Sequence, residues 1–141
     1  LYFMGVALAL AAARLFRAVA FAESTHARNH LSVLGQIGST EENLKAAWSG
    51  ETFEIDEMYA AYNAVAKLQE NKSAQTTFRY AEAAERDHQF IYDTAHKQVK
   101  GGQDFGPESV WVCPVCGHTV IGTVPDYCVQ CGTTKEYFKE F

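Results

Sequence analysis

The sequence has no cysteine outside residues 113–131, no surplus of positive charge and no apolar run long enough to cross a membrane. Because all four cysteines lie in that short segment, no disulfide can cross-link the rest of the chain. The formal net charge of −5 argues against a nucleic-acid partner, since phosphate binding requires a basic surface. The apolar run Gly5–Ala13 is far shorter than the roughly 20 residues of a membrane span, so we expect no membrane partner.

The N-terminal segment lacks acidic residues before Glu23 and basic residues before its apolar run. A secretory signal peptide begins with basic residues, so the second absence argues against one, although Ala20-Phe21-Ala22 resembles a cleavage site. Apolar residues make up 48% of the chain and charged residues 21%, which is typical of a soluble globular protein. We expect residues of the natural chain to be missing before Leu1.

Helical patterns fill the first two thirds of the chain. Ser39 followed by Glu42 forms a capping box that predicts a helix start, and Gly101-Gly102 predicts the end of the last helix. The predicted helices cover residues 6–35, 40–50, 51–70 and 74–99. From Val110 the composition changes to cysteine, valine, aromatics and turn-forming residues, which predicts short strands and loops. We therefore expect a helical domain over residues 1–106 and a small domain over residues 107–141.

Two Glu-x-x-His pairs, Glu23 with His26 and Glu85 with His88, lie in the predicted helices. Side chains three residues apart share one face of a helix, one turn apart. Each pair continues a stripe of otherwise apolar residues, so we expect both pairs to point into the core of a helical bundle. The alternative is that each pair lies on a solvated helix face.

A third apolar stripe begins with two carboxylates, Glu51 and Glu54, and continues toward Leu68. Burying so many carboxylates without cations would be very unfavourable. Two metal ions would offset the charge, and mixed carboxylate and imidazole ligation suits iron or manganese. Two Glu-x-x-His pairs with single glutamates from two further helices are typical of the di-iron and di-manganese sites of ferritin-like bundles.

The remaining histidines, acids and tyrosines near these stripes have simpler interpretations. His30 could support the site, but a surface or satisfied core histidine is the simpler assignment. We expect solvated or supporting roles for Glu57 and Glu82, and surface positions for His96 and His118. Tyr59 and Tyr92 are core aromatics by default, although a phenol near the metals could donate a hydrogen bond or a proton.

Two Cys-x-x-Cys-Gly loops predict a metal site with four thiolate ligands, which are Cys113, Cys116, Cys128 and Cys131. Two residues between the thiolates let one tight turn present both sulfurs to one ion. The glycine that follows can adopt a positive φ and lets backbone N–H groups approach the sulfurs. Tetrahedral sulfur ligation suits iron or zinc, and a structural zinc ribbon is the alternative. We expect a small core over the site, formed by Trp111, Tyr127, Tyr137 and Phe138.

Taken together, these motifs closely resemble the rubrerythrin family. The resemblance covers residues 14–141 and follows the family order. Its motifs are Arg14-Leu15-Phe16-Arg17-Ala18, Ala22-Glu23 to His30, Gly50 to Glu54, Glu57-Met58-Tyr59, Glu85 to His88 and both cysteine loops. The resemblance implies a mainly α protein: a ferritin-like four-helix bundle with a non-haem di-iron site, followed by a small rubredoxin-like β/loop domain with one iron bound by four cysteines.

The resemblance also implies roles for individual residues. The expected ligands of the two irons are Glu23, His26, Glu51, Glu54, Glu85 and His88. Glu54 and His26 would exchange as ligands of one iron on reduction, which makes them the expected catalytic residues. The family has a further glutamate on a first helix that this sequence lacks. We therefore expect a preceding helix. The alternatives are a partner chain that exchanges helices to complete the bundle, or a site that is incomplete.

The function implied by the resemblance is reduction of hydrogen peroxide to water in oxidative-stress defence. Electrons would come from a donor protein, a rubredoxin or an NAD(P)H-dependent reductase, through the four-cysteine iron. In a dimer or larger oligomer in the cytoplasm, the cysteine domain of one chain would dock beside the di-iron site of the other. The alternative is an iron-binding, electron-carrier or ferroxidase-like protein with structural zinc at the cysteines.

Overall fold

The computed structural model describes residues 2–106 and 109–141, which fall into two compact units, one up to Gly38 and one from Ser39 to Phe141. The first unit consists mainly of helix α1 (Tyr2–Val33). The chain leaves this helix through Gly35, whose φ of +65° matches the helix end predicted there. Phe16 and Val33 are 73% and 88% exposed, so the apolar stripe of α1 is not buried within this unit.

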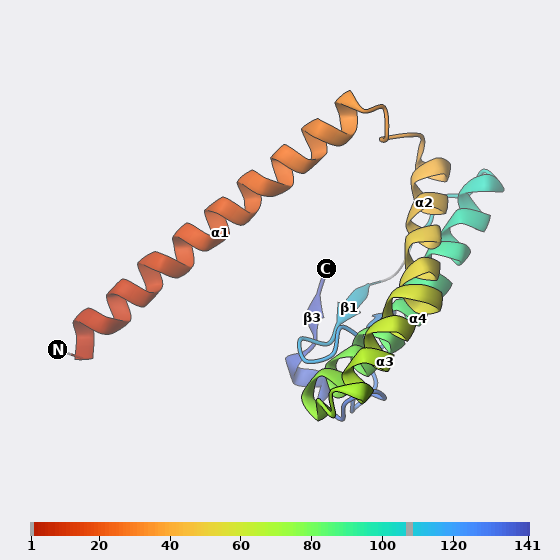
Figure 1. Ribbon diagram of the computed structural model, residues 1–141. Helices are drawn as coiled ribbons and strands as arrows, with labels where there is room; N and C mark the ends of the chain where they lie inside the picture. The colour runs from red at the N-terminus through yellow and green to blue at the C-terminus, as the bar shows by residue number, and fades with distance from the viewer. Residues whose placement is uncertain (1, 107–108) are drawn as a thin grey trace. The chain divides into compact units, whose positions relative to one another are not determined.

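The second unit contains a long helical segment packed along α4 (Lys72–Lys100). The segment runs without interruption through α2 (Thr40–Phe53), the π-helical turn η1 (Glu54–Met58) and α3 (Tyr59–Leu68) (Figure 1). Ser39 and Glu42 form the predicted capping box. The helix end predicted near Gly50 is wrong, because Gly50 lies inside α2. Glycine costs a helix about 1 kcal/mol, which packing against α4 outweighs.

The π-helical turn changes which face of α3 meets α4. The sequence predicts a buried stripe that ends in Val65 and Leu68, but these side chains are 51% and 84% exposed. Tyr59 and Tyr62 instead pack against Phe78 of α4, with ring centroids 6.3 and 5.6 Å away. A π-turn inserts one residue into the helix and rotates the face that follows. A regular helical period therefore assigns the wrong stripe beyond Glu54.

The C-terminal module, residues 110–141, is a three-stranded antiparallel sheet with loops. Its strands are β1 (Val110–Val112), β2 (Thr119–Ile121) and β3 (Lys139–Glu140), in the order β2-β1-β3, with the short helix η2 (Lys135–Tyr137) before β3. Trp111 pairs with Val120 on one side and Glu140 on the other. The module lies against α4 of the same chain, where β2 contacts the helix.

The core of this module differs in part from the predicted one. Phe138 is buried among the cysteines and Trp111 packs against them, as expected. Tyr127 and Tyr137 are 63% and 65% exposed, so their predicted core positions are wrong. Tyr80 of α4 packs against the cysteines instead. The module lies against α4, so part of its core comes from that helix. The sequence of residues 110–141 alone could not predict this contribution.

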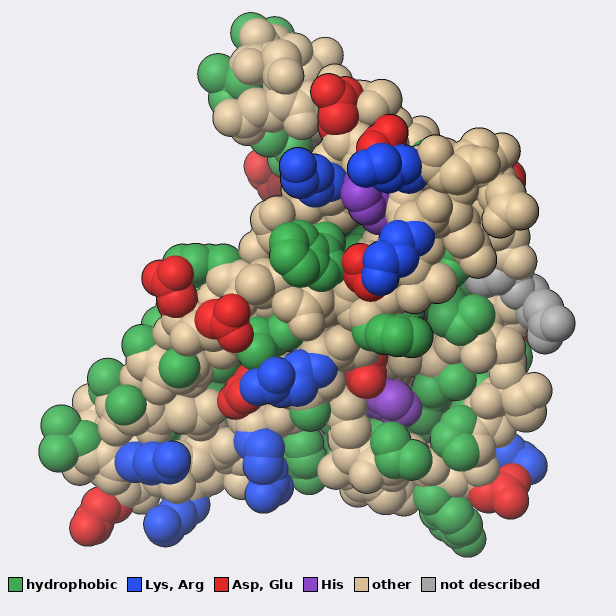
Figure 2. All heavy atoms as spheres, turned by 90° about the vertical axis from the view of Figure 1, so that its right-hand side faces the viewer, with side chains coloured by type: hydrophobic (Ala, Val, Ile, Leu, Met, Phe, Trp, Pro, Cys, Tyr) green, Lys and Arg blue, Asp and Glu red, His purple; other side chains and the backbone are tan. Residues whose placement is uncertain are grey.

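The charged surface is mixed. On the face seen in Figure 2, lysine and arginine side chains are interspersed with aspartate and glutamate rather than gathered in one continuous patch. Among the residues that the structure describes, no helix combines the length and apolar character needed to cross a membrane.

Candidate metal centres

The four cysteines meet at one point between the two loops of the C-terminal module. Their sulfur atoms all lie within 4.8 Å of one another. The Sγ atoms of Cys113 and Cys131 are 3.6 Å apart, and those of Cys116 and Cys128 are 3.5 Å apart. Four sulfurs placed tetrahedrally at about 2.3 Å from a metal would be separated by about 3.8 Å. The cluster therefore fits a single tetrahedral ion.

Backbone N–H groups surround these sulfurs. Gly117 and Gly132 have φ of +81° and +80°, the left-handed conformation expected after each loop. Burial raises the pKa of the Cys116 thiol, against a hydrogen bond from the backbone N–H of His118. Burial also acts to raise the pKa of Cys131, but the hydroxyl and N–H of Thr133 help to lower it to about 6. A bound cation and these donors would stabilise the thiolate form.

A second group of ligating side chains, the Glu–Glu–His cluster of Glu51, Glu85 and His88, lies between α2 and α4. One ligand atom from each lies within 4.8 Å of the others. The His88 Nδ1 is 2.7 Å from Glu85 Oε2 and 3.7 Å from Glu51 Oε1. The carboxylate side chains are only 16% and 15% exposed. Half-buried carboxylates beside an imidazole nitrogen are suited to an iron or manganese ion.

The electrostatics of the Glu–Glu–His cluster favour a cation. Burial and the negative charge of Glu85 raise the pKa of Glu51 to about 7. Burial and the same carboxylates raise the pKa values of two nearby phenols, Tyr59 and Tyr92, which therefore stay protonated. Two carboxylates held this close repel each other, and a divalent ion between them would remove that repulsion.

The other three predicted ligands from the helices lie outside the Glu–Glu–His cluster. Glu54 lies in η1, close enough for its charge to raise the pKa of Glu51 and of Tyr59. Glu23 and His26 lie on α1 in the first unit, with His26 Nδ1 3.4 Å from Glu23 Oε2. The structure thus brings together three of the six candidates in the second unit and pairs two others in the first.

A polar network joins the C-terminal module to α4. His118 Nδ1 lies 2.6 Å from Asp87 Oδ2, and Gln130 Nε2 donates to the same oxygen at 2.8 Å. His118 is only 9% exposed, so its predicted surface position is wrong. Asp87, which immediately precedes His88 in the sequence, gives the buried His118 ring a hydrogen-bond partner, and buried polar groups need such partners.

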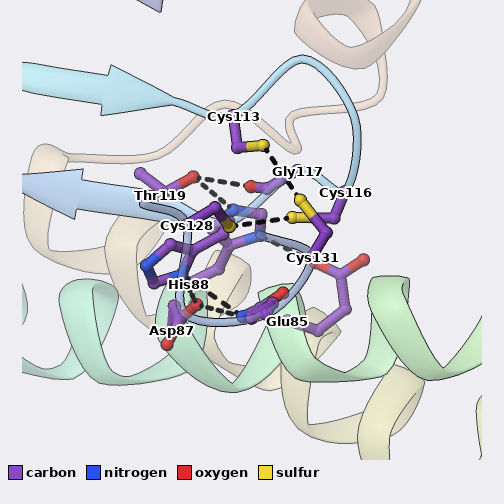
Figure 3. Close-up of polar contacts among 11 residues, drawn as sticks. Glu85, Asp87, His88, Cys113, Cys116, Gly117, Thr119, Cys128 and Cys131 are labelled. Atoms are coloured by element: carbon purple, nitrogen blue, oxygen red, sulfur yellow. Dashed lines mark hydrogen bonds and ion pairs between the residues drawn. The ribbon is translucent and has the colours of Figure 1, made fainter. Parts of the chain in front are cut away.

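One contact links the Glu–Glu–His cluster to the C-terminal module that carries the four cysteines. The Nε2 atom of His88 lies 2.9 Å from the Oγ1 atom of Thr119, at the start of β2 (Figure 3). The cysteine domain lies against α4 of its own chain. Docking of this domain beside the di-iron site of another chain stays a prediction. No sequence signal indicated Thr119, Asp87 or Gln130, because their partners are more than thirty residues away along the chain.

Comparison with known proteins agrees with both centres. A family model described as rubrerythrin matches residues 9–96, and one described as the rubrerythrin rubredoxin-like domain matches residues 111–139. Rubrerythrin-2 of Clostridium acetobutylicum is 37% identical over 91% of this chain and 77% of its own length. Rubrerythrin of Porphyromonas gingivalis is 30% identical over 90% of this chain and 72% of its own length.

A solved structure also resembles this fold. The partially reduced state of nigerythrin matches 74% of this chain with a TM-score of 0.67 and 26% sequence identity. This chain spans about half, 51%, of the nigerythrin chain. The architecture is therefore mainly α and ferritin-like, with a small rubredoxin-like domain.

Proposed function

The chain belongs to the rubrerythrin family, and we propose that it reduces hydrogen peroxide to water. Rubrerythrin domains bind a di-iron site, and the rubredoxin-like domain binds one iron through four cysteines. The observation that carries the proposal is the contact between His88 of the Glu–Glu–His cluster and Thr119 of the module that carries the four cysteines, at 2.9 Å. A module that carries one electron at a time and contacts a ligand of the helical metal site is suited to a reductase whose metal site must be reduced again after each turnover.

The Glu–Glu–His cluster supplies half of the proposed di-iron site. Glu23, His26 and Glu54 complete the ligand set in this proposal, with His26 and Glu54 alternating on one iron as its charge changes. A carboxylate favours the ferric ion and a neutral imidazole suits the ferrous ion. Glu23 and His26 would come from this chain or from a second copy that exchanges α1. The protein would then act as a homodimer or larger oligomer.

Two irons at this site would supply the two electrons that cleave the oxygen–oxygen bond. The reaction also consumes two protons, and the phenols of Tyr59 and Tyr92 are candidate donors. Both phenols have pKa values raised by burial and by neighbouring carboxylates, so each keeps its proton near neutral pH. The half-buried setting of Glu51 and Glu85 limits competing water.

Iron held by the four cysteines would supply electrons one at a time to the oxidised di-iron site. We propose that residues 1–106 form the di-iron domain and residues 107–141 the electron-transfer domain. The electron donor would be a rubredoxin or an NAD(P)H-dependent reductase in the cytoplasm. The mixed surface charge in Figure 2 offers both signs for docking such a donor.

The test is anaerobic mixing of reduced, iron-loaded protein with hydrogen peroxide and, separately, with dioxygen. We expect peroxide to oxidise the protein much faster than dioxygen does. Equal rates would replace the peroxidase proposal with an oxidase. A colourless protein, prepared with ample iron and without metal exchange, would instead favour an iron-binding protein with structural zinc at the cysteines, since a ferric four-thiolate site is red.

A further inference from the structure

His88 uses both of its ring nitrogens. Nδ1 faces the two carboxylates of the Glu–Glu–His cluster and lies 2.7 Å from Glu85 Oε2. Nε2 points the other way, 2.9 Å from Thr119 Oγ1 in the C-terminal module. Thr119 Oγ1 in turn donates to the backbone carbonyl of Gly117 at 3.1 Å. Figure 3 shows this series of contacts, which runs from His88 on α4 through Thr119 to Gly117, in the loop that carries Cys116.

The hydrogen count of the Thr119 hydroxyl decides the tautomer of His88. A hydroxyl has one hydrogen, and here that hydrogen goes to the Gly117 carbonyl. Toward His88 the oxygen can then only accept, so Nε2 must carry a hydrogen. Without a metal, the 2.7 Å contact between Nδ1 and Glu85 Oε2 needs a hydrogen of its own. A metal bound to Nδ1 would take the place of that hydrogen, and the neutral ring, protonated at Nε2, would offer it the lone pair of Nδ1. That is the nitrogen that faces Glu51 and Glu85 and that a metal would bind.

We propose that Thr119 is a positioning residue for the helical metal site, supplied by the C-terminal module. This inference rests on the Glu–Glu–His cluster being a metal site, as in the proposed function. By accepting from Nε2, the Thr119 hydroxyl fixes both the ring orientation and the metal-binding tautomer of His88. Partners of this kind on a ligating histidine typically change metal affinity by about 10- to 100-fold.

The surroundings leave little to replace this hydroxyl. A pocket of about 280 Å³ lies beside His88 and Thr119. Most of its remaining lining is apolar, contributed by Ile91, Phe105, Val110 and Ile121, with Tyr92 at one side. Without the hydroxyl, the Nε2–H group would lose its acceptor in a mainly apolar pocket. The His88 ring could then turn or adopt the other tautomer, which carries its hydrogen on the metal-binding nitrogen.

Other contacts hold the module on α4 independently of Thr119. Asp87 accepts from Gln130 and pairs with His118. Gly117 also approaches α4 so closely that a methyl group in its place would touch the Ala84 Cβ at 3.6 Å. Removing the Thr119 hydroxyl should therefore leave the module docked. One consequence is that the helical site gains its full metal affinity only while the module is folded and docked.

The test compares Thr119→Val, which keeps the shape but removes the hydroxyl, with Thr119→Ser, which keeps the hydroxyl. The full-length protein is first loaded with zinc at the four cysteines and then titrated with Mn²⁺, with free Mn²⁺ followed by electron paramagnetic resonance. We expect the Val variant to bind Mn²⁺ at the helical site about 10- to 100-fold more weakly than the wild type. The Ser variant should bind within a few-fold of the wild type.

Two further measurements distinguish an effect of Thr119 on the His88 ring from a general effect on the folding of the module. The Nε2–H proton of His88 should appear in NMR spectra of the zinc-loaded wild type and Ser variant, and should shift or exchange rapidly in the Val variant. Co²⁺ bound by the four cysteines should give the same visible spectrum in every variant, which shows that the module is folded. Should the Val variant lose that spectrum, Thr119→Ala takes its place, since it also lacks the hydroxyl.

The outcomes separate this inference from the function on which it rests. Equal Mn²⁺ affinity in the wild type and the Val variant would overturn the role of Thr119 and leave the metal site standing. Weak binding by the Ser variant would also overturn it, because packing of the methyl group would then explain the loss. Absence of a helical Mn²⁺ site in the wild type would overturn both the site and this inference.

Discussion

The two metal centres of this protein are built in opposite ways. The four-cysteine cluster takes all its ligands from two short loops within residues 113–131, and all four sulfurs lie within 4.8 Å of one another in one unit. The Glu–Glu–His cluster joins residues from α2 and α4, while Glu23 and His26 belong to the other unit. A site made by local turns is complete wherever those turns fold, whereas a site made by long helices depends on how they assemble.

The largest predicted effect breaks the local site. Cys116→Ser should abolish tetrahedral metal binding by the C-terminal module, because three thiolates cannot complete the cluster. Metal binding supplies roughly 10–16 kcal/mol in small zinc-folded peptides, so the module should also unfold. Visible spectra of Co²⁺-loaded protein measure the first effect and circular dichroism the second. The control is Val129→Ala, whose side chain is 76% exposed between two cysteines. A folded, metal-bound Ser variant would contradict a four-thiolate site.

The next effect breaks only the assembled site. Glu85→Ala should abolish metal binding at the Glu–Glu–His cluster and leave the red colour of the four-cysteine iron unchanged. Iron analysis together with the visible spectrum measures both. Glu82→Ala is the matched control, one turn earlier on the same helix, where the carboxylate accepts from Arg86 at 2.8 Å. Loss of both centres in the Glu85 variant would mean that they are not separable.

A smaller effect loosens the connection between the centres. Asp87→Ala leaves His118 and Gln130 without their shared acceptor, which should weaken docking of the module by about 1–3 kcal/mol. Hydrogen exchange of the backbone amides in β2 should become faster. Asp93→Ala, which removes a more exposed partner of Lys97, should leave that exchange unchanged. Equal exchange in the two variants would show that the Asp87 network does not hold the module.

The smallest effect concerns acidity in the metal-free protein. The pKa of Glu51 is about 7 when folded, against an ordinary value of 4.5. The folded protein therefore binds this proton more tightly than the unfolded chain, so its stability should fall as pH rises from about 4.5 to about 7. Glu51→Gln should remove this part of the pH dependence, measured by denaturant unfolding. An unchanged pH dependence would show that Glu51 titrates normally.

The same contrast explains what the sequence predicts well. The four cysteines, the capping box at Ser39 and the break around Asn71 depend on residues close together in the chain, and each is confirmed in the structure. The helix end at Gly50, the stripe beyond Glu54 and the surface position of His118 are wrong. Each depends on contacts with α4 or on a π-turn that interrupts the helical period.

Thr119 belongs to the same class of residue that the sequence cannot reveal. It has no motif, and its importance comes only from the position of His88 on a distant helix. The ligand roles of Glu23 and His26 stay predictions, because both residues lie on α1 in the first unit. The role of Glu54 stays a prediction because it lies outside the Glu–Glu–His cluster.

The two centres should act together in one reaction, and a stopped-flow experiment shows whether they do. Fully reduced, iron-loaded protein is mixed anaerobically with hydrogen peroxide while the red absorption of the ferric four-cysteine iron is recorded. If they do, this absorption appears promptly in the wild type and is largely absent in Glu85→Ala. Equal rates in the two proteins would contradict such joint action, because peroxide would then oxidise the four-cysteine iron without the helical site.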